Sequence, residues 1–177
     1  MRIIAGSSRG TILYAPPGNR VRPTSDRVRE ALFSILGGRI ADAWALDAYA
    51  GVGAVGLEAL SRGASGCDFI EADRGVLRYL KKNIERTRLT EKARVFTQRV
   101  ERFVSGWREA DAPYGVVFAD PPYGGDPEEV AGLLRPVVGG LLVLEAADAA
   151  PDPRFEGYAL TDRRRYGRTA LYFLEPR

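Results

Sequence analysis

The sequence predicts an α/β fold with a doubly wound, mostly parallel β-sheet. From residue 43 onward, short apolar runs alternate with amphipathic helical segments, which is the pattern of repeated strand–helix–strand units. A glycine-rich turn joins the first run to the segment after it, as in sheets that bind nucleosides at the ends of their strands. The 177 residues suffice for one domain. We therefore expect a single domain over residues 1–177, with a basic extension at 1–39 and the core at 40–177.

The extension is expected to begin with a hairpin. Residues 2–6 and 11–14 flank a polar turn, so Arg2 and Arg9 would point outward. Residues 1–39 hold seven arginines against two acidic residues, a net charge of +5 in a chain whose total is +3. A basic arm of this kind favours nucleic acid as the partner. The alternative is a solvated surface in a chain that uses arginine in place of lysine.

A helix is predicted next, with Thr24 as its N-cap and Gly37-Gly38 at its end. Arg27 and Arg29 lie off its apolar face and would reach a ligand or solvent. The apolar face consists of Val28, Ala31, Leu32, Ile35 and Leu36.

The core elements follow from the change of hydrophobic period along the chain. We expect strands at 43–47, 67–71, 93–97, 115–119 and 140–145. Helices are expected at 53–62, 74–87, 100–107 and 126–135. The last helix has a clear start, with Asp126 as N-cap and Pro127 in the first turn. Residues 158–161 and 169–174 are expected to form a final hairpin.

The composition excludes several classes of site. The chain has no histidine and one cysteine, Cys67, so an internal disulfide, a Cys–His pair and an imidazole metal site are impossible. We expect no metal, and Cys67 should be a buried core residue. No apolar run is long enough to span a membrane, and residues 1–3 do not open a signal peptide. We expect a cytoplasmic protein without membrane contact.

The glycine-rich turn predicts a nucleoside site. Gly51, Gly53 and Gly56 fit the spacing G-x-G-x-x-G between a strand and a helix, and Glu71 follows Gly51 by twenty residues, where an acid would bind a ribose diol. Asp47 discriminates among the possible ligands, because a carboxylate four residues before Gly51 would lie close to a bound pyrophosphate and repel it. S-adenosylmethionine has a ribose, an ammonium group and a sulfonium but no phosphate, so it suits the turn. A tight turn without ligand is the structural alternative.

A second site is predicted at Asp120, Pro121, Pro122 and Tyr123, directly after the apolar strand 115–119. The prolines hold the backbone extended, so a carboxylate, backbone carbonyls and a flat ring would meet a planar group that carries an exocyclic amine. The first and fourth strands are neighbours in doubly wound sheets, which brings this stretch beside the glycine turn. Methyl transfer to an amine fits that arrangement. An ordinary strand-to-turn connection is the alternative.

The chain resembles the RsmD-type bacterial methyltransferases, which act on guanine N2 of 16S ribosomal RNA. The resemblance runs almost end to end, and its segments are residues 1–6, 22–30, 46–64, 120–123 and 164–171. It implies a seven-stranded sheet of order 3-2-1-4-5-7-6 with an antiparallel last strand and a Rossmann-like core. It also implies S-adenosylmethionine as methyl donor and 16S rRNA or the small ribosomal subunit as partner. We expect the protein to act as a monomer.

The resemblance also implies roles for individual residues. Asp120, Pro121, Pro122 and Tyr123 would hold the guanine. The cofactor would contact Asp47, Tyr49, Gly51 and Gly53 at its methionine end, Glu71 and Ala72 at its ribose, and Arg99 and Val100 at its adenine. Arg99 stands where the family more often has an acid. The candidates for RNA binding are Arg22, Thr24, Arg27, Arg29, Arg164, Arg165 and Tyr166, because rRNA loops are held by phosphate contacts and stacking.

Three other functions stay open from the residues alone. An adenine-N6 methyltransferase on DNA or RNA would use residues 120–123 equally well, although the chain has no separate target-recognition domain. A nucleotide-dependent oxidoreductase or a non-catalytic nucleotide-binding module is disfavoured by Asp47. An RNA-binding assembly factor with an inactive site is the third alternative.

Overall fold

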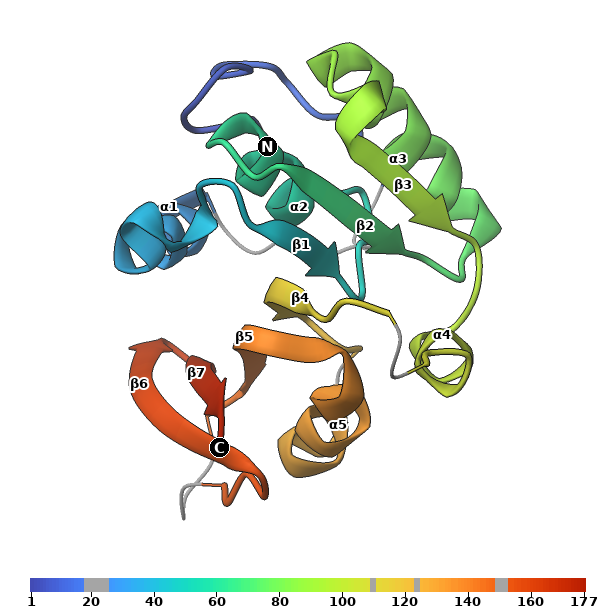
Figure 1. Ribbon diagram of the computed structural model, residues 1–177. Helices are drawn as coiled ribbons and strands as arrows, with labels where there is room; N and C mark the ends of the chain where they lie inside the picture. The colour runs from blue at the N-terminus through green and yellow to red at the C-terminus, as the bar shows by residue number, and fades with distance from the viewer. Residues whose placement is uncertain (18–25, 109–110, 123–124, 149–152) are drawn as a thin grey trace.

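The computed structural model describes residues 1–17, 26–108, 111–122, 125–148 and 153–177. These residues form an α/β fold around one seven-stranded sheet (Figure 1). The strand order is β3-β2-β1-β4-β5-β7-β6, in which β1 to β5 are parallel and β7 is antiparallel to both of its neighbours. The predicted fold class and strand order are confirmed.

The predicted core elements are all present, close to their expected bounds. The strands are β1 (Trp44–Asp47), β2 (Gly66–Ile70), β3 (Ala93–Phe96), β4 (Tyr114–Ala119), β5 (Val138–Ala147), β6 (Tyr158–Tyr166) and β7 (Thr169–Pro176). The helices are α1 (Asp26–Leu36), α2 (Ala54–Ser61), α3 (Arg74–Thr87), α4 (Val100–Ser105) and α5 (Pro127–Leu134), with short 3₁₀ turns η1 (Gly37–Ile40), η2 (Thr90–Lys92) and η3 (Arg135–Val137). The Asp126 carboxylate accepts a hydrogen bond from Glu128 N at 2.9 Å, which confirms the predicted N-cap of α5.

The sheet separates two apolar cores, because successive side chains of each strand point to opposite faces. In β4, Val116 and Phe118 belong to the first core, and Val117 and Ala119 belong to the second. Residues of α1, α2 and α3 close the first core, and residues of α4 and α5 close the second. Figure 1 shows these helices on the two sides of the sheet.

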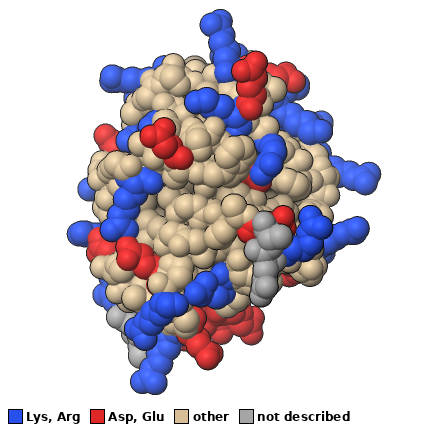
Figure 2. Space-filling model, viewed as in Figure 1, with Lys and Arg blue, Asp and Glu red and all other residues tan. Residues whose placement is uncertain are grey.

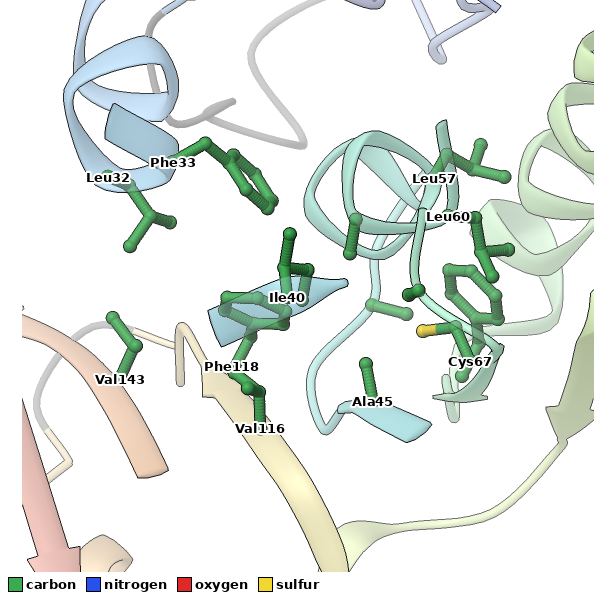
Figure 3. Packing of buried hydrophobic residues seen from close by; sticks show 14 of the residues in the cluster. Leu32, Phe33, Ile40, Ala45, Leu57, Leu60, Cys67, Val116, Phe118 and Val143 are labelled. Carbon is green, nitrogen blue, oxygen red and sulfur yellow. The ribbon is translucent and has the colours of Figure 1, made fainter. Parts of the chain in front are cut away.

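Helix α1 covers the middle of the sheet on the side of the first core. Figure 3 shows Leu32 and Phe33 of α1 pointing toward Val143 of β5 and Phe118 of β4. The ring centroids of Phe33 and Phe118 are 5.7 Å apart. Cys67 is fully buried in the same core, as predicted. The extension therefore contributes part of the core that lies beneath the predicted site.

The amino-terminal segment is held by helix α2 as well as by its own hairpin. The hairpin is smaller than predicted, with one antiparallel bridge between Arg2 and Ile12. The buried Glu58 carboxylate of α2 accepts hydrogen bonds from Ile4 N at 2.7 Å and Ala5 N at 3.0 Å. Ser61, on the same helix, donates to Ala5 O at 2.6 Å. Because α2 begins in the glycine turn, the amino-terminal segment is fixed to the element that would hold the cofactor.

Two other details differ from the expectation. Helix α1 ends at Leu36 as predicted, but the 3₁₀ turn η1 follows directly after it. The last hairpin is longer than predicted, since its first strand was expected over residues 158–161 and β6 continues to residue 166. Thr24, the predicted N-cap of α1, lies outside the described residues. No helix in the described part of the chain is long and apolar enough to cross a membrane.

Candidate active site

A cleft lies at the carboxyl ends of β1, β4 and β5. It contains residues of the glycine turn together with Asp120, so the two predicted halves of the site share one cavity. Strands β1 and β4 are adjacent, with Asp47 in register with Phe118, and Ala48 N donates to Phe118 O at 2.9 Å just beyond the ladder. The lining residues are Met1, Leu32, Asp47, Tyr49, Ala50, Gly51, Val52, Ala54, Val55, Phe118, Ala119, Asp120, Val143, Glu145 and Leu171.

The glycine turn needs its glycines for two physical reasons. Gly51 and Gly53 have φ of 55° and 85°, a backbone conformation that side chains disfavour. Gly56 has no space for a side chain, because a Cβ there would lie 2.3 Å from the Phe69 ring. The turn therefore brings its backbone close to the end of β1 and leads directly into α2.

Asp47 ends β1 beneath this turn and is 5% exposed. Its Oδ2 accepts a hydrogen bond from Gly56 N at 2.9 Å. Burial raises the pKa of the Asp47 carboxyl to about 7, and the negative charge of Glu71 adds to this rise, while the hydrogen bond from Gly56 opposes it. A cation in the cleft would stabilise the ionised form. The site is thus built to favour positive charge.

Glu71 follows β2 and binds the turn itself. Its Oε2 accepts from Gly51 N at 2.9 Å, and its Oε1 accepts from Asp73 N at 2.6 Å. Asp73 in turn caps α3 by accepting from Gly75 N at 2.6 Å and Val76 N at 3.1 Å. Each carboxylate oxygen can accept two hydrogen bonds, and these contacts use one on each oxygen, so Glu71 can also accept from a ribose hydroxyl. The neighbouring Ala72 is exposed.

Tyr49, Arg99 and Val100 lie toward the second core. Val100 is buried at the first position of α4, and Arg99 is the exposed residue before it. Tyr49 is half-buried against this core. Burial raises the pKa of Tyr49, and the nearby negative charge of Glu101 raises it further. Position 99 is an arginine, but the acidic Glu101 lies two residues later, close enough to the cleft residue Tyr49 to affect its pKa.

The second predicted half of the site, which starts at Asp120, begins directly after β4. Asp120 is exposed and lines the cleft, Pro121 is half-buried, and Pro122 is exposed. Tyr123 lies outside the described residues. The structure thus brings Asp120 to the same cavity as Asp47, Tyr49 and the glycine turn, as the strand order predicted.

Several lining residues were missed by the sequence analysis. Met1, Leu32, Val143 and Leu171 are apolar and come from four different segments, so no local pattern marks them. Glu145 is different, because it follows the apolar run of β5 just as Asp120 follows that of β4. That parallel was visible in the sequence once β4 and β5 were taken as neighbours.

The predicted contribution of Arg29 to RNA binding is wrong. Its side chain is fully buried: Nη2 donates to Arg2 O and, at 3.1 Å, to Asp26, and Nε lies 4.0 Å from Glu58. Burial lowers the pKa of Arg29, although both carboxylates oppose that shift. The residue lies off the apolar face of α1, but the amino-terminal segment packs over it. Arg29 is therefore a structural residue.

The other RNA-binding candidates that the structure describes lie on α1 and on β6. Arg27 is exposed on α1, while Arg22 and Thr24 lie outside the described residues. Arg164 and Arg165 are half-exposed on the edge strand β6, with acidic partners: Asp162 lies 3.0 Å from Arg164, and Asp148 lies 3.1 Å from Arg165. Tyr166 packs partly against the first core. On the face in Figure 2, basic side chains are spread around the edge of the molecule.

Among the described residues, no three Cys, Asp or Glu side chains gather in a way that would hold a metal ion.

Comparison with known proteins supports this description. A family model described as Conserved hypothetical protein 95 matches residues 1–175. Ribosomal RNA small subunit methyltransferase D of Escherichia coli (strain K12) is 46% identical over 123 residues, which cover 70% of this chain and 60% of that protein. The protein of the same name from Haemophilus influenzae is 41% identical over 125 residues, which cover 70% of this chain and 64% of that protein. The matched stretch is thus less than two thirds of either relative.

The solved structure of yhhF from Escherichia coli agrees over a longer range. It superposes with a TM-score of 0.86 at 37% identity and covers 99% of this chain and 97% of that one. The chain therefore belongs to the family described as Conserved hypothetical protein 95, and its resemblance to the RsmD-type methyltransferases is confirmed.

Proposed function

We propose that this protein transfers a methyl group from S-adenosylmethionine to the N2 amine of a guanine in 16S rRNA. The observation that carries the proposal is the shared cleft in which Asp47 and Asp120 stand at the ends of adjacent strands. The relatives named Ribosomal RNA small subunit methyltransferase D support the choice of substrate. Guanine N2 is the acceptor that the RsmD resemblance implies.

The donor half of the cleft fits S-adenosylmethionine. The buried Asp47 carboxyl, whose pKa is raised to about 7, suits a ligand that brings positive charge and no phosphate. Glu71 would accept from the ribose, with Ala72 beside it, while Tyr49, Gly51 and Gly53 would line the methionine end. Val100 and Arg99 would lie toward the adenine.

The acceptor half would prepare the amine for attack. When bound, S-adenosylmethionine supplies an electrophilic methyl group, and the new carbon–nitrogen bond forms as the carbon–sulfur bond breaks, with release of S-adenosylhomocysteine and one proton. Asp120 would accept a hydrogen bond from the amine, and the Pro121 carbonyl would act as a second acceptor, so that the nitrogen lone pair turns toward the methyl group. No strong base is required, because alignment alone lowers a barrier by up to ~7–11 kcal/mol. Pro122 and Tyr123 would complete the guanine pocket.

The remaining parts of the proposal concern the partner. Arg22, Thr24 and Arg27 of the extension, with Arg164, Arg165 and Tyr166 of β6, would contact the RNA phosphates and stack on exposed bases. The target base would be splayed out of its helix to reach the cleft. We further propose a monomeric, cytoplasmic, single-domain enzyme.

One experiment tests the function directly. Labelled S-adenosylmethionine is incubated with small ribosomal subunits that lack the modification and, separately, with their naked 16S rRNA, and the labelled nucleoside is then identified. We expect N2-methylguanosine. Label in N6-methyladenosine would replace the proposed acceptor, and an absence of label in both substrates would contradict methyl transfer to rRNA.

A further inference from the structure

The acceptor part of the cleft contains a second carboxylate to which the proposed reaction assigns no role. Glu145 lines the same cavity as Asp120 and is half-buried near the end of β5. The two strands are parallel neighbours, with Ala119 in register with Leu144. Asp120 and Glu145 are the next residues of each strand. Adjacent strands are ~4.8 Å apart, so the register brings the backbone of Asp120, just past the end of β4, beside that of Glu145 in β5.

The alternation of side chains along β4 and β5 also assigns both carboxylates to the same face of the sheet. In β4, Phe118 faces the first core and Ala119 the second, so the alternation returns Asp120 to the side of Phe118. In β5, Val143 faces the first core and Leu144 the second, which returns Glu145 to the same side. Phe118, Asp120, Val143 and Glu145 all line the cleft, as this alternation predicts, and Ala119 lines it as well at the end of β4.

Several described residues of the cleft near the pair are apolar. Leu32 of α1 points toward Val143, next to the cleft, as Figure 3 shows. Leu171 of β7 is in register with Glu145 and lines the cavity on its other side, and Met1 completes the wall. A ligand pocket with apolar walls takes its specificity from the few polar groups that it contains. Among the described lining residues that follow β4 and the apolar run of β5, the polar side chains are those of Asp120 and Glu145.

We propose that Glu145 selects guanine by accepting a hydrogen bond from its N1–H while Asp120 accepts one from its N2 amine. This inference rests on the proposed function and names the residue that would choose the base. Guanine presents N1–H and N2–H donors side by side on its Watson–Crick edge, which matches two adjacent carboxylates. Adenine presents an amine beside the lone pair of its N1, and a carboxylate facing that lone pair would repel it. Glu145 would therefore reject adenine at a site where Asp120 alone accepts either amine.

The test compares two bases that differ in this respect. Small subunits are reconstituted with 16S rRNA in which the acceptor nucleotide is either guanosine or 2,6-diaminopurine riboside, which keeps the N2 amine but has a lone pair at N1. The wild-type protein should prefer guanosine by about 100-fold in kcat/KM, because the Glu145 carboxylate would face the N1 lone pair of diaminopurine instead of the N1–H of guanine. Glu145→Gln should lower kcat/KM for guanosine about 10- to 100-fold and narrow the preference, because the amide can donate to N1.

The control variant is Glu91→Gln, the same chemical change on the exposed turn η2. It should leave both rates unchanged. Affinity for S-adenosylhomocysteine, measured by calorimetry, should be equal in wild type, Glu145→Gln and Glu91→Gln, which shows that the donor half is intact.

Three outcomes would overturn the inference. They are equal use of both bases by the wild type, an unaltered preference in Glu145→Gln, and a loss of cofactor affinity in Glu145→Gln that accounts for the whole loss of rate. If the wild type methylates guanosine and any of these is found, the proposed function stands and the role of Glu145 falls. If the wild type methylates neither base, the proposed function itself is contradicted. The first outcome needs no variant, so the test holds even if Glu145→Gln does not fold.

Discussion

The Tyr114 hydroxyl of β4 donates a hydrogen bond of 2.6 Å to the Asp68 carboxylate of β2, across the intervening strand β1. Asp68 is fully buried and also accepts from Arg94 Nε at 2.7 Å and from Trp44 Nε1 at 3.2 Å. The Arg94 guanidinium lies 4.8 Å from the centre of the Trp44 ring. One buried carboxylate thus connects β1, β2, β3 and β4, the four strands that carry the donor half and Asp120.

Replacing Tyr114 with phenylalanine should remove one hydrogen bond from the Asp68 network and leave the others in place. The buried carboxylate loses one donor but keeps Arg94 and Trp44, so the free energy of unfolding should fall by about 1 to 2 kcal/mol in urea denaturation at pH 7. Tyr79→Phe on α3 is the control and should change it by less than ~0.5 kcal/mol. Equal values for the two variants would mean that the Asp68 network does not stabilise the sheet.

The same tyrosine gives a pH dependence of stability. Burial raises the pKa of Tyr114, and its hydrogen bond to Asp68 raises it further. In the unfolded chain a tyrosine ionises near pH ~10. The contribution of Tyr114 is therefore complete below about pH 10 and is lost as the pH rises above it. The stability difference between wild type and Tyr114→Phe should shrink over that range.

Affinity for S-adenosylmethionine should depend on pH through Asp47. Since burial raises the pKa of the Asp47 carboxyl to about 7, the free protein holds it mostly protonated at pH 6 and mostly ionised at pH 8. A cationic ligand binds the ionised form, so Kd should fall about tenfold between these values. Asp47→Asn should bind more weakly and lose this dependence, as measured by calorimetry. An identical pH profile in that variant would assign the dependence to another group.

Without ligand, a rise in pH should lower the contribution of Asp47 to the free energy of unfolding, whereas the same rise increases the affinity for S-adenosylmethionine. The unfolded carboxyl loses its proton near its ordinary pKa of 3.8, well below the folded value. The stabilising contribution is thus complete below about pH 4 and is lost as the pH rises toward 7. Thermal unfolding of wild type and Asp47→Asn between pH 4 and 8 would show whether the difference follows this sign.

Asp120→Ala should separate methyl transfer from cofactor binding. The side chain lies in the acceptor part of the cleft, so its removal should abolish detectable transfer to rRNA while Kd for S-adenosylmethionine changes less than about twofold. Turnover assays and isothermal titration measure the two quantities. Lost cofactor affinity with preserved turnover would reverse the proposed division of the cleft.

Arg29 and Arg27 should respond differently to replacement by alanine. Removal of the buried Arg29 leaves Arg2 O without its donor and opens a cavity, although Glu58 keeps Arg62 at 2.7 Å, so we expect a loss of about 2 to 4 kcal/mol of unfolding free energy. Arg27 is exposed, so its removal should cost less than ~0.5 kcal/mol. Urea denaturation of both variants tests this, and similar losses would refute the structural role given to Arg29.

The double variant Arg22→Ala/Arg27→Ala should reduce RNA binding. If both side chains neutralise phosphates, the negative slope of log affinity against log salt concentration should become less steep by about 2 in the double variant. Arg78→Ala/Lys82→Ala, two exposed changes on α3, serves as the charge-matched control. Methylation and binding that stay at wild-type level across salt concentrations would remove the extension from the RNA contact surface.

Much of the core was predictable because its patterns are local. The parallel strands are mostly apolar, although β2 contains Asp68 and β3 contains Arg94, and the glycine turn has a fixed spacing, so β1 to β5 and the position of Asp47 followed from the sequence. Strand β6 was only partly predicted, since its exposed edge carries Arg163 to Arg165, which have no strand-like alternation. The burial of Arg29 depends on the amino-terminal segment that packs over it, and the role of Glu145 depends on strand register. No local pattern encodes the burial of Arg29, whereas the place of Glu145 after an apolar run was visible in the sequence and only its pairing with Asp120 needed the register of β4 and β5.

The position of Met1 in the wall of the cleft has a practical consequence. A peptide fused ahead of Met1 would emerge in the cleft that Asp120 and Glu145 also line, where the substrate base is expected. The first residues are also pinned to α2 through Glu58 and Ser61, so trimming them would unsettle the helix that follows the glycine turn. Affinity tags and fluorescent labels for the assays above therefore belong at the carboxyl terminus.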